Sequence, residues 1–190
     1  LISCSSKSKN ETENQDTSTS HISSYSRGII SNSSEIQIAF KDNWKSEGIG
    51  EIVPNTLFEL SPKMEGEMYW MASNIVRFKP KNRFQSGATY TVKVKLSSLS
   101  DLEDFTYELK IREQSADINL KGLKSYDKSS LKWQQLEGEL RLADFADEAQ
   151  FSGFIAQQGE RKLPITWTFD KSRLIQYFTV DSVQRTLEES

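Results

Sequence analysis

The chain has 190 residues, with 27 acidic against 24 basic side chains, a formal net charge of −3 and a pI near 5.4. Because the basic residues are dispersed among acidic ones, charge gives no reason to expect a nucleic-acid partner. The chain has one cysteine, Cys4, and one histidine, His21, which excludes an internal disulfide and a Cys/His metal site. No apolar run approaches the roughly 20 residues of a membrane-spanning helix.

The first four residues, Leu1-Ile2-Ser3-Cys4, resemble the bacterial lipobox. The resemblance implies cleavage before Cys4 and a diacylglycerol on its sulfur, so that a lipid on Cys4 would hold the protein to a membrane. Ser5 is not the aspartate that retains many lipoproteins in the inner membrane, which favours the outer membrane. The expected location is therefore the cell envelope, periplasmic or surface-exposed. The alternative is an ordinary unstructured N-terminus with a stray cysteine.

Residues 5–26 are almost entirely polar and cannot bury enough apolar surface to offset the entropy of ordering. The sequence therefore predicts that residues 1–28 form a lipobox remnant and a disordered tether. A flexible coil of about 20 residues reaches on the order of 25 Å.

From Ile29 onward, apolar and polar residues alternate with the period of a half-buried strand. Six strands with short turns are predicted, around residues 36–40, 57–60, 68–72, 76–79, 90–96 and 105–111. Their spacing indicates an Ig-like β-sandwich over residues 29–114. Gln114 to Asp117 has no periodic pattern and is a predicted junction.

A second β-rich domain is expected over residues 115–190, so the predicted fold class is all-β, with two consecutive sandwiches. Its strands are expected near residues 118–123, 151–155, 163–169 and 174–183, and residues 131–142 are expected to form either a strand pair or one strand bent around Gly138. A hairpin turn is expected at Gly159 and one helical turn within 143–150. Three of the four tryptophans, Trp70, Trp133 and Trp167, fall on strand-period positions and are expected in the core. Trp44 is expected to be partly exposed, and an exposed aromatic platform for carbohydrate is the less favoured alternative.

Two acidic clusters are the candidate ion sites: Asp101, Glu103 and Asp104, and then Asp144, Asp147 and Glu148. Neither has the ligand spacing of an EF-hand loop, so solvated acidic loops are the favoured interpretation and loose calcium binding the alternative. No phosphate-binding glycine loop or nucleophile elbow is present. No catalytic residue, metal ligand or cofactor is therefore expected, and the sequence leaves any ligand-binding residues unknown.

Several strings in the first β region resemble the N-terminal Ig-like domain of bacterial alpha-2-macroglobulins. They are 34–40 (SEIQIAF), 58–62 (FELSP), Gly66 with 69–70 (YW), 76–80 (VRFKP) and 84–92 (FQSGATYTV). The second region resembles the macroglobulin-type domain that follows in those proteins, through 138–140 (GEL), 143–144 (AD), 164–167 (PITW), 178–180 (FTV) and 184–185 (QR).

This resemblance implies the N-terminal region of a Bacteroidota-like lipoprotein of the alpha-2-macroglobulin family. It would consist of the Ig-like sandwich over residues 29–114 and a macroglobulin-type sandwich over residues 115–190, the latter complete or truncated at its C-terminus. The complete family member is thought to trap proteases from a host or competitor through a bait segment, in some members with a Cys-Gly-Glu-Gln thioester. This sequence contains neither, so the implied role is a non-catalytic scaffold that holds later domains of the parent chain off the membrane. The alternative is a free-standing Ig-like surface lipoprotein, acting as an adhesin or glycan-binding module.

Overall fold

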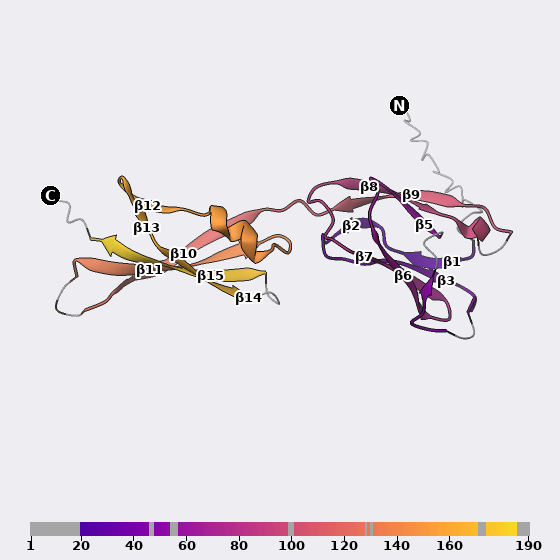
Figure 1. Cartoon of the computed structure of the whole chain (residues 1–190), viewed down its shortest axis with the longest axis horizontal. Helices are drawn as coiled ribbons and strands as arrows, with labels where there is room; N and C mark the ends of the chain where they lie inside the picture. Colours follow the sequence, from indigo (N-terminus) through magenta and orange to yellow (C-terminus); the bar gives the residue numbers. More distant parts are fainter. Residues whose placement is uncertain are drawn as a thin grey trace, which may run out of the picture. The chain divides into compact units, whose positions relative to one another are not determined.

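The computed structural model describes residues 20–45, 48–53, 57–98, 101–127, 129, 131–170 and 174–185. Over these residues the chain is almost entirely β-strand (Figure 1), which confirms the all-β prediction. The chain divides into two compact units, which are not cut at a single point in the sequence. Unit 1 comprises the described residues of Leu1–Arg27, Glu35–Asn82 and Thr91–Glu108, and unit 2 those of Gly28–Ser34, Arg83–Tyr90 and Leu109–Ser190.

Two sheets hold the strands between residues 22 and 111. The five-stranded sheet has the order β1 (Ile22–Tyr25), β3 (Ile36–Phe40), β7 (Ile75–Pro80), β6 (Gly66–Ala72), β4 (Ile52–Val53). The four-stranded sheet has the order β2 (Gly28–Ile30), β9 (Phe105–Ile111), β8 (Thr89–Val94), β5 (Phe58–Ser61). The neighbours in the five-stranded sheet are antiparallel, as are β5 and β8, whereas β2 and β9 run parallel. A short 3-10 turn, η2 (Leu96–Ser98), follows β8.

Alternation along these strands sends one set of side chains inward, as in a sandwich. The buried set includes Ile36, Ile38, Phe40, Val76, Phe78, Tyr90, Val92, Val94, Phe105, Leu109 and Ile111. These are the positions that the period-2 pattern predicted, so the pattern identified the core of this region correctly.

The predicted tether was partly wrong. Residues 22–25 form β1, which pairs with β3 through Ile22↔Phe40 and Tyr25↔Ile38. Ile22 is buried, and the Tyr25 ring lies 4.6 Å from the Tyr107 ring. Ile22 and Tyr25 provide the apolar contacts that the polar residues around them cannot make. The prediction missed this strand because it rested on the average composition of the whole stretch. The rest of the predicted tether, residues 1–19, lies outside the described residues.

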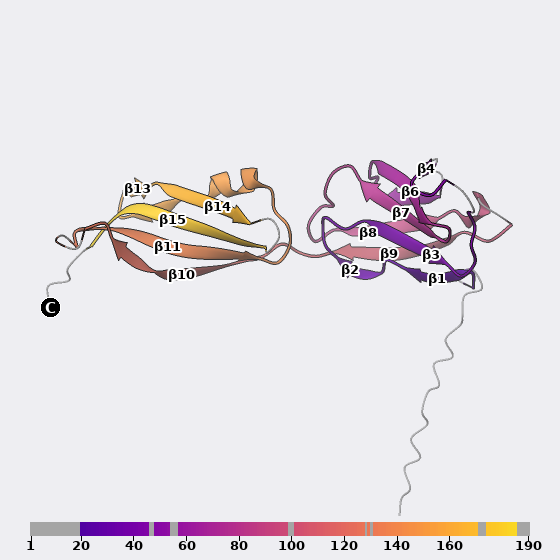
Figure 2. The same cartoon turned by 90° about the horizontal axis from the view of Figure 1, so that it is seen from below.

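Unit 2 contains an antiparallel four-stranded sheet with the order β10 (Ala116–Ser125), β11 (Trp133–Leu142), β15 (Ile175–Gln184), β14 (Ile165–Asp170), which can be followed in Figure 2. A hairpin of β12 (Ala156–Gln158) and β13 (Arg161–Leu163) and a 3-10 segment, η3 (Glu148–Gly153), lie on the same side of this sheet (Figure 1). The hairpin turns at Gly159 with a φ of +60°, as predicted.

Two predictions for this region were wrong. Residues 151–155, expected as a strand, are the end of η3 and the loop after it. Gln150 Oε1 accepts a hydrogen bond from the Asp147 backbone N–H at 2.8 Å, which favours a helical start over an extended chain. Gly138 does not divide its segment into two strands, because β11 runs unbroken from Trp133 to Leu142. The glycine instead leaves room for the Phe178 ring, whose nearest carbon would lie 2.3 Å from a Cβ at position 138.

Candidate interaction surface

The register of the unit 2 sheet separates an apolar face from a polar face. Two cross-strand rows on the apolar face are Leu123, Leu136, Val180 and Ile165, then Leu120, Gly138, Phe178 and Trp167. A third row begins with Ile118 and Leu140 and ends with Gln176 and Phe169. A bulge between Leu120 and Gly122 keeps Leu123 on the apolar face.

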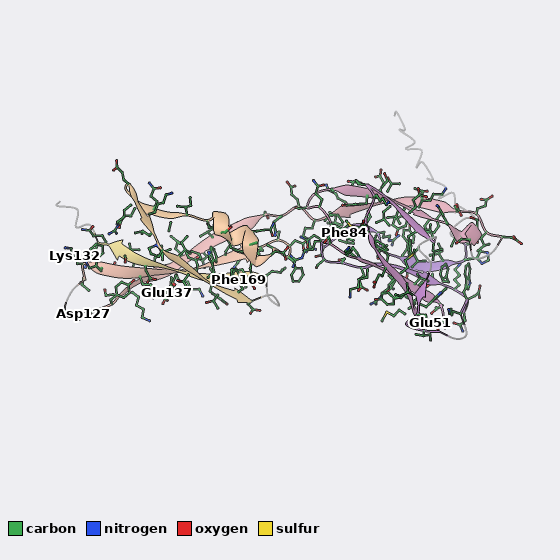
Figure 3. The ribbon with its side chains drawn as sticks, viewed as in Figure 1. Glu51, Phe84, Asp127, Lys132, Glu137 and Phe169 are labelled. Carbon is green, nitrogen blue, oxygen red and sulfur yellow. The ribbon has the colours of Figure 1, made fainter. Side chains whose placement is uncertain are left out.

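Among the described residues, segments cover only the β14 side of this apolar face and leave its β10 side open. Phe151 of η3 is buried, with its ring 5.0 Å from the rings of both Trp167 and Phe169. Phe154 completes the cluster, 5.3 Å from Trp167. Aromatic contacts at these distances stabilise a core beyond the area that they bury, so η3 acts as a partial second layer. Phe169 and, on the polar face, Glu137 are labelled in Figure 3.

The β10 side of the same face is open. All residues of β10 are exposed except the half-exposed Ser125, and Ile118, Leu120 and Leu123 are each between 56% and 59% exposed. Between β10 and the hairpin lies a groove of about 350 Å³, which we call the β10 groove. Its lining is Ile118, Leu120, Leu136, Leu140, Phe154, Ile155, Ala156, Gln157, Gln158, Leu163, Ile165, Trp167, Phe178, Val180 and Val183. None of these side chains is charged.

Hydrogen bonds fix the hairpin wall of the groove to the end of β15. Gln158 donates from Nε2 to the Gln184 carbonyl at 2.6 Å and accepts from the Gln184 N–H at 2.8 Å. Arg161 donates to the Ser182 carbonyl at 2.6 Å, and its guanidinium lies 4.9 Å from the Trp133 ring centroid. The groove is therefore held open by its own wall, although β12 and β13 have only three residues each.

The opposite face of the sheet is polar and centres on Glu139. This buried carboxylate accepts hydrogen bonds from Arg141 at 2.7 and 2.9 Å and from Asn119 at 3.3 Å, and pairs with Lys121 at 3.1 Å. The hydrogen bonds from Arg141, then those from Asn119 and Lys121, lower the pKa of Glu139 to about 2. A solvated face on one side and an apolar face on the other is the usual pattern of an antiparallel sheet with one buried side.

The structure does not assemble either acidic cluster into an ion site. Asp104 pairs with Lys93 and accepts hydrogen bonds from the hydroxyl and backbone N–H of Ser97, and the Ser97 bonds hold the Asp104 pKa below its usual value. Asp144 is fully buried within unit 2, where it accepts hydrogen bonds from the Asn32 N–H and the Ser31 hydroxyl. No group of three candidate metal ligands gathers anywhere in the described part of the chain.

The remaining predicted residues differ in outcome. Trp70 is buried as expected, and Trp44 is partly exposed, stacked on Phe40 at 4.3 Å. Trp133 was predicted in the core and is 38% exposed, because it faces Lys132 and Arg161 at the end of the sheet. Trp167 is half-buried in the η3 cluster. Cys4, the predicted lipid attachment residue, lies outside the described residues. Within those residues, no helix has the length and apolar character to cross a membrane.

Sequence reasoning missed the β10 groove. The alternation of Ile118 and Leu120 was recognised as a strand and assumed to face a complete core. The one available signal was the shortness of the segments between Gln150 and Pro164, which leaves three residues for each strand of the second layer. A layer of that size cannot cover a sheet whose longest strands have ten residues.

The described residues form an Ig-like β region and a second β unit whose sheet has an apolar face that they leave partly open. Residues 6–100 match the bacterial Ig domain family, and the chain belongs to that family. No curated protein matches the chain.

Among solved structures, the chain aligns with L,D-transpeptidase 3 from Mycobacterium tuberculosis in complex with a faropenem-derived adduct. That alignment has 11% identity and a TM-score of 0.36, over 80% of this chain and 58% of that one. An L,D-transpeptidase from Mycobacterium tuberculosis H37Rv aligns at 12% identity and a TM-score of 0.36, over 80% and 60%. The chain thus spans about three-fifths of the length of these structures. At such TM-scores the likeness carries no argument about this protein.

Proposed function

We propose that this chain is a non-catalytic scaffold region of a lipid-anchored, alpha-2-macroglobulin-like protease inhibitor. The observation that carries the proposal is the β10 groove, an uncharged and rigidly walled surface on the second of two consecutive β units. A scaffold needs an apolar surface on which other domains pack, whereas an enzyme needs convergent titratable groups. The groove provides an apolar packing surface, and no titratable side chain is among its lining residues.

The family membership supports the coarser part of this proposal, an Ig-like module. The finer part rests on the sequence resemblance of the first β region to the Ig-like domain, and of the second to the macroglobulin-type domain, of bacterial alpha-2-macroglobulins. In this arrangement Cys4 holds the lipid, and the two units hold the later trapping domains away from the membrane. The partners are then the membrane, the later domains and the attacked protease.

The function is tested with the parent protein. Incubation with an endoprotease should give a complex that co-purifies with the parent protein, whereas residues 1–190 alone should leave the protease free and fully active. A parent protein that never retains a protease would refute the inhibitor role. The anchor is tested separately: Cys4→Ala should move the protein from the membrane fraction to the soluble fraction, and continued membrane association would contradict lipid attachment.

A glycan-binding or adhesive module is the second candidate, and one observation favours it. Tyr126 and Trp133 are both exposed aromatics. The Tyr126 hydroxyl donates to the Asp181 carboxylate and accepts from the Ser182 backbone N–H. The Trp133 ring lies beside Arg161, which donates to the Ser182 carbonyl. However, Arg161 and Lys132 already lie over the Trp133 ring, where a sugar would stack. Binding to a glycan array that is lost in Trp133→Ala would favour this candidate over the scaffold.

A further inference from the structure

The β10 groove is a gap in the second layer of unit 2. The hairpin forms a two-stranded sheet, and within the described residues no strand pairs with the outer edge of β12. All three β12 residues, Ala156 to Gln158, line the groove. Backbone groups along such an edge are free to bind another strand. The gap therefore borders both an apolar floor and a row of hydrogen-bonding groups.

The chemistry of the lining restricts what fits there. The floor consists of aliphatic and aromatic side chains, and the polar lining residues are two neutral glutamines at one end. A charged occupant would lose its hydration without gaining an ionic partner. Successive cross-strand rows lie two residues apart along β11, so the three rows together span roughly 13 Å. This is the length of a strand of about five residues.

Area distinguishes between one strand and a second copy of the chain. The exposed parts of Ile118, Leu120, Leu123 and Ile155 are about 60% of each residue. At roughly 60–120 Å² for a whole aliphatic side chain, they offer roughly 150–300 Å². Two copies packed face to face through these residues would then bury on the order of 600 Å² of apolar surface at most, below the roughly 700 Å² of non-polar area in an interface of roughly 1,200 Å², the lower limit for a stable complex. A single strand needs no more than the area available.

The path of the chain indicates where such a strand comes from. Val183 lines the groove, and Gln184 is hydrogen-bonded to Gln158 at the hairpin tip. β15 therefore leaves the sheet at one end of the groove, next to the edge of β12. Because consecutive strands are usually neighbours joined by short connections, a strand following β15 could enter the groove directly.

We infer that the β10 groove is the seat of an extended, uncharged β-strand that follows β15 in the parent polypeptide and pairs with β12, so completing the second layer. The source of the strand rests on the proposed function, which makes this chain part of a longer polypeptide. The fit of the strand to the groove rests only on the lining, the free edge and the area.

The fit is tested by adding a strand to the chain. A flexible Gly/Ser linker of ten residues, with a reach of roughly 17 Å, is placed after Ser190 and followed by six residues of alternating valine and threonine. The matched control has lysine in place of each valine. Nile red fluorescence reports on the groove, hydrogen exchange on the amides of Ala156 to Gln158, and sedimentation velocity on association.

The valine strand should reduce Nile red binding at least fivefold, slow exchange in β12 at least tenfold and raise the unfolding midpoint of unit 2 by about 4–8 °C. The lysine strand should leave all three unchanged. Leu120→Lys should abolish the effect of the valine strand, while Ile52→Lys, at a somewhat more exposed apolar position in unit 1, should not. Equal behaviour of the two added strands, or dye exclusion that appears only with dimerisation, would overturn the inference.

The source is tested by comparing residues 1–190 with the parent protein. The β12 amides should exchange slowly in the parent and at least tenfold faster in residues 1–190, and equal rates would overturn the assignment to a later segment. This readout does not depend on protease capture. A parent protein that protects the β12 amides but retains no protease would refute the proposed function, while still supporting the inference that a later strand occupies the β10 groove.

Discussion

Gly138 offers a sharp test of how the apolar face of unit 2 is built. A Cβ at this position would lie 2.3, 2.8 and 2.9 Å from three carbons of the Phe178 ring. Gly138→Ala must therefore displace the ring from its place beside Trp167, whose centroid is 5.3 Å away. Overpacking of this kind costs about 1–3 kcal/mol, which exceeds the roughly 0.5–1 kcal/mol that alanine gains over glycine within a strand.

The assay is urea unfolding followed by tryptophan fluorescence in a Trp44→Phe, Trp70→Phe background, so that the signal comes from Trp133 and Trp167 in unit 2. Gly153→Ala is the matched control, because no atom lies within 4 Å of its added Cβ, and its effect should stay within about 0.5 kcal/mol. Phe178→Leu replaces the ring that causes the clash with a smaller side chain. The double variant Gly138→Ala/Phe178→Leu should be more stable than the sum of the single changes by about 1–2 kcal/mol. Strictly additive effects, or a Gly138→Ala variant as stable as Gly153→Ala, would refute the reasoning.

Three further predictions concern polar groups. Because the folded-state pKa of Glu139 is lowered, its stabilising effect is present above its ordinary pKa of 4.5 and is lost as the pH falls towards about 2; the unfolding midpoints of the wild type and Glu139→Gln should therefore converge between pH 5 and 2, and a constant difference would contradict this. Asp144→Ala leaves the buried Asn32 N–H without its acceptor and should cost about 1–3 kcal/mol in urea unfolding, whereas Asp147→Ala, which removes an exposed pair with Arg83, should cost at most about 1 kcal/mol. Tyr107 has a buried hydroxyl with no hydrogen-bond partner among the described residues, and burial raises its pKa; Tyr107→Phe should leave stability unchanged or increase it by about 1 kcal/mol, and a clear loss would reveal a partner.

The acidic clusters show why spacing in sequence is a weak guide to an ion site. Asp144, Asp147 and Glu148 lie within five residues of one another, yet Asp144 points into a buried set of backbone and hydroxyl donors while Asp147 pairs with Arg83 at the surface. Two donors to the Asp144 carboxylate, Ser31 and Asn32, lie more than 100 residues away in the chain, and a third is the N–H of the adjacent Phe145. Local pattern therefore could not assign the two carboxylates to different environments.

The sequence by itself determined most of the long strands and which side of each strand is apolar. Period-2 alternation at Ile36, Ile38 and Phe40, and again at Ile165 and Trp167, follows from the pleat of a strand and needs no knowledge of its neighbours. Gly159 likewise specifies a turn locally, because glycine adopts a positive φ without steric cost.

Only the tertiary structure decided which apolar faces are covered. Ile118 and Leu120 alternate as regularly as Ile36 and Ile38, but the first pair is more than half exposed and the second fully buried. The difference lies in the second layer. On the hairpin side of unit 2 this layer has only two strands of three residues each, which Gln158 and Arg161 hydrogen-bond to the end of β15. Burial depends on which distant segment lies above a face, and the residues of the face itself do not encode that partner.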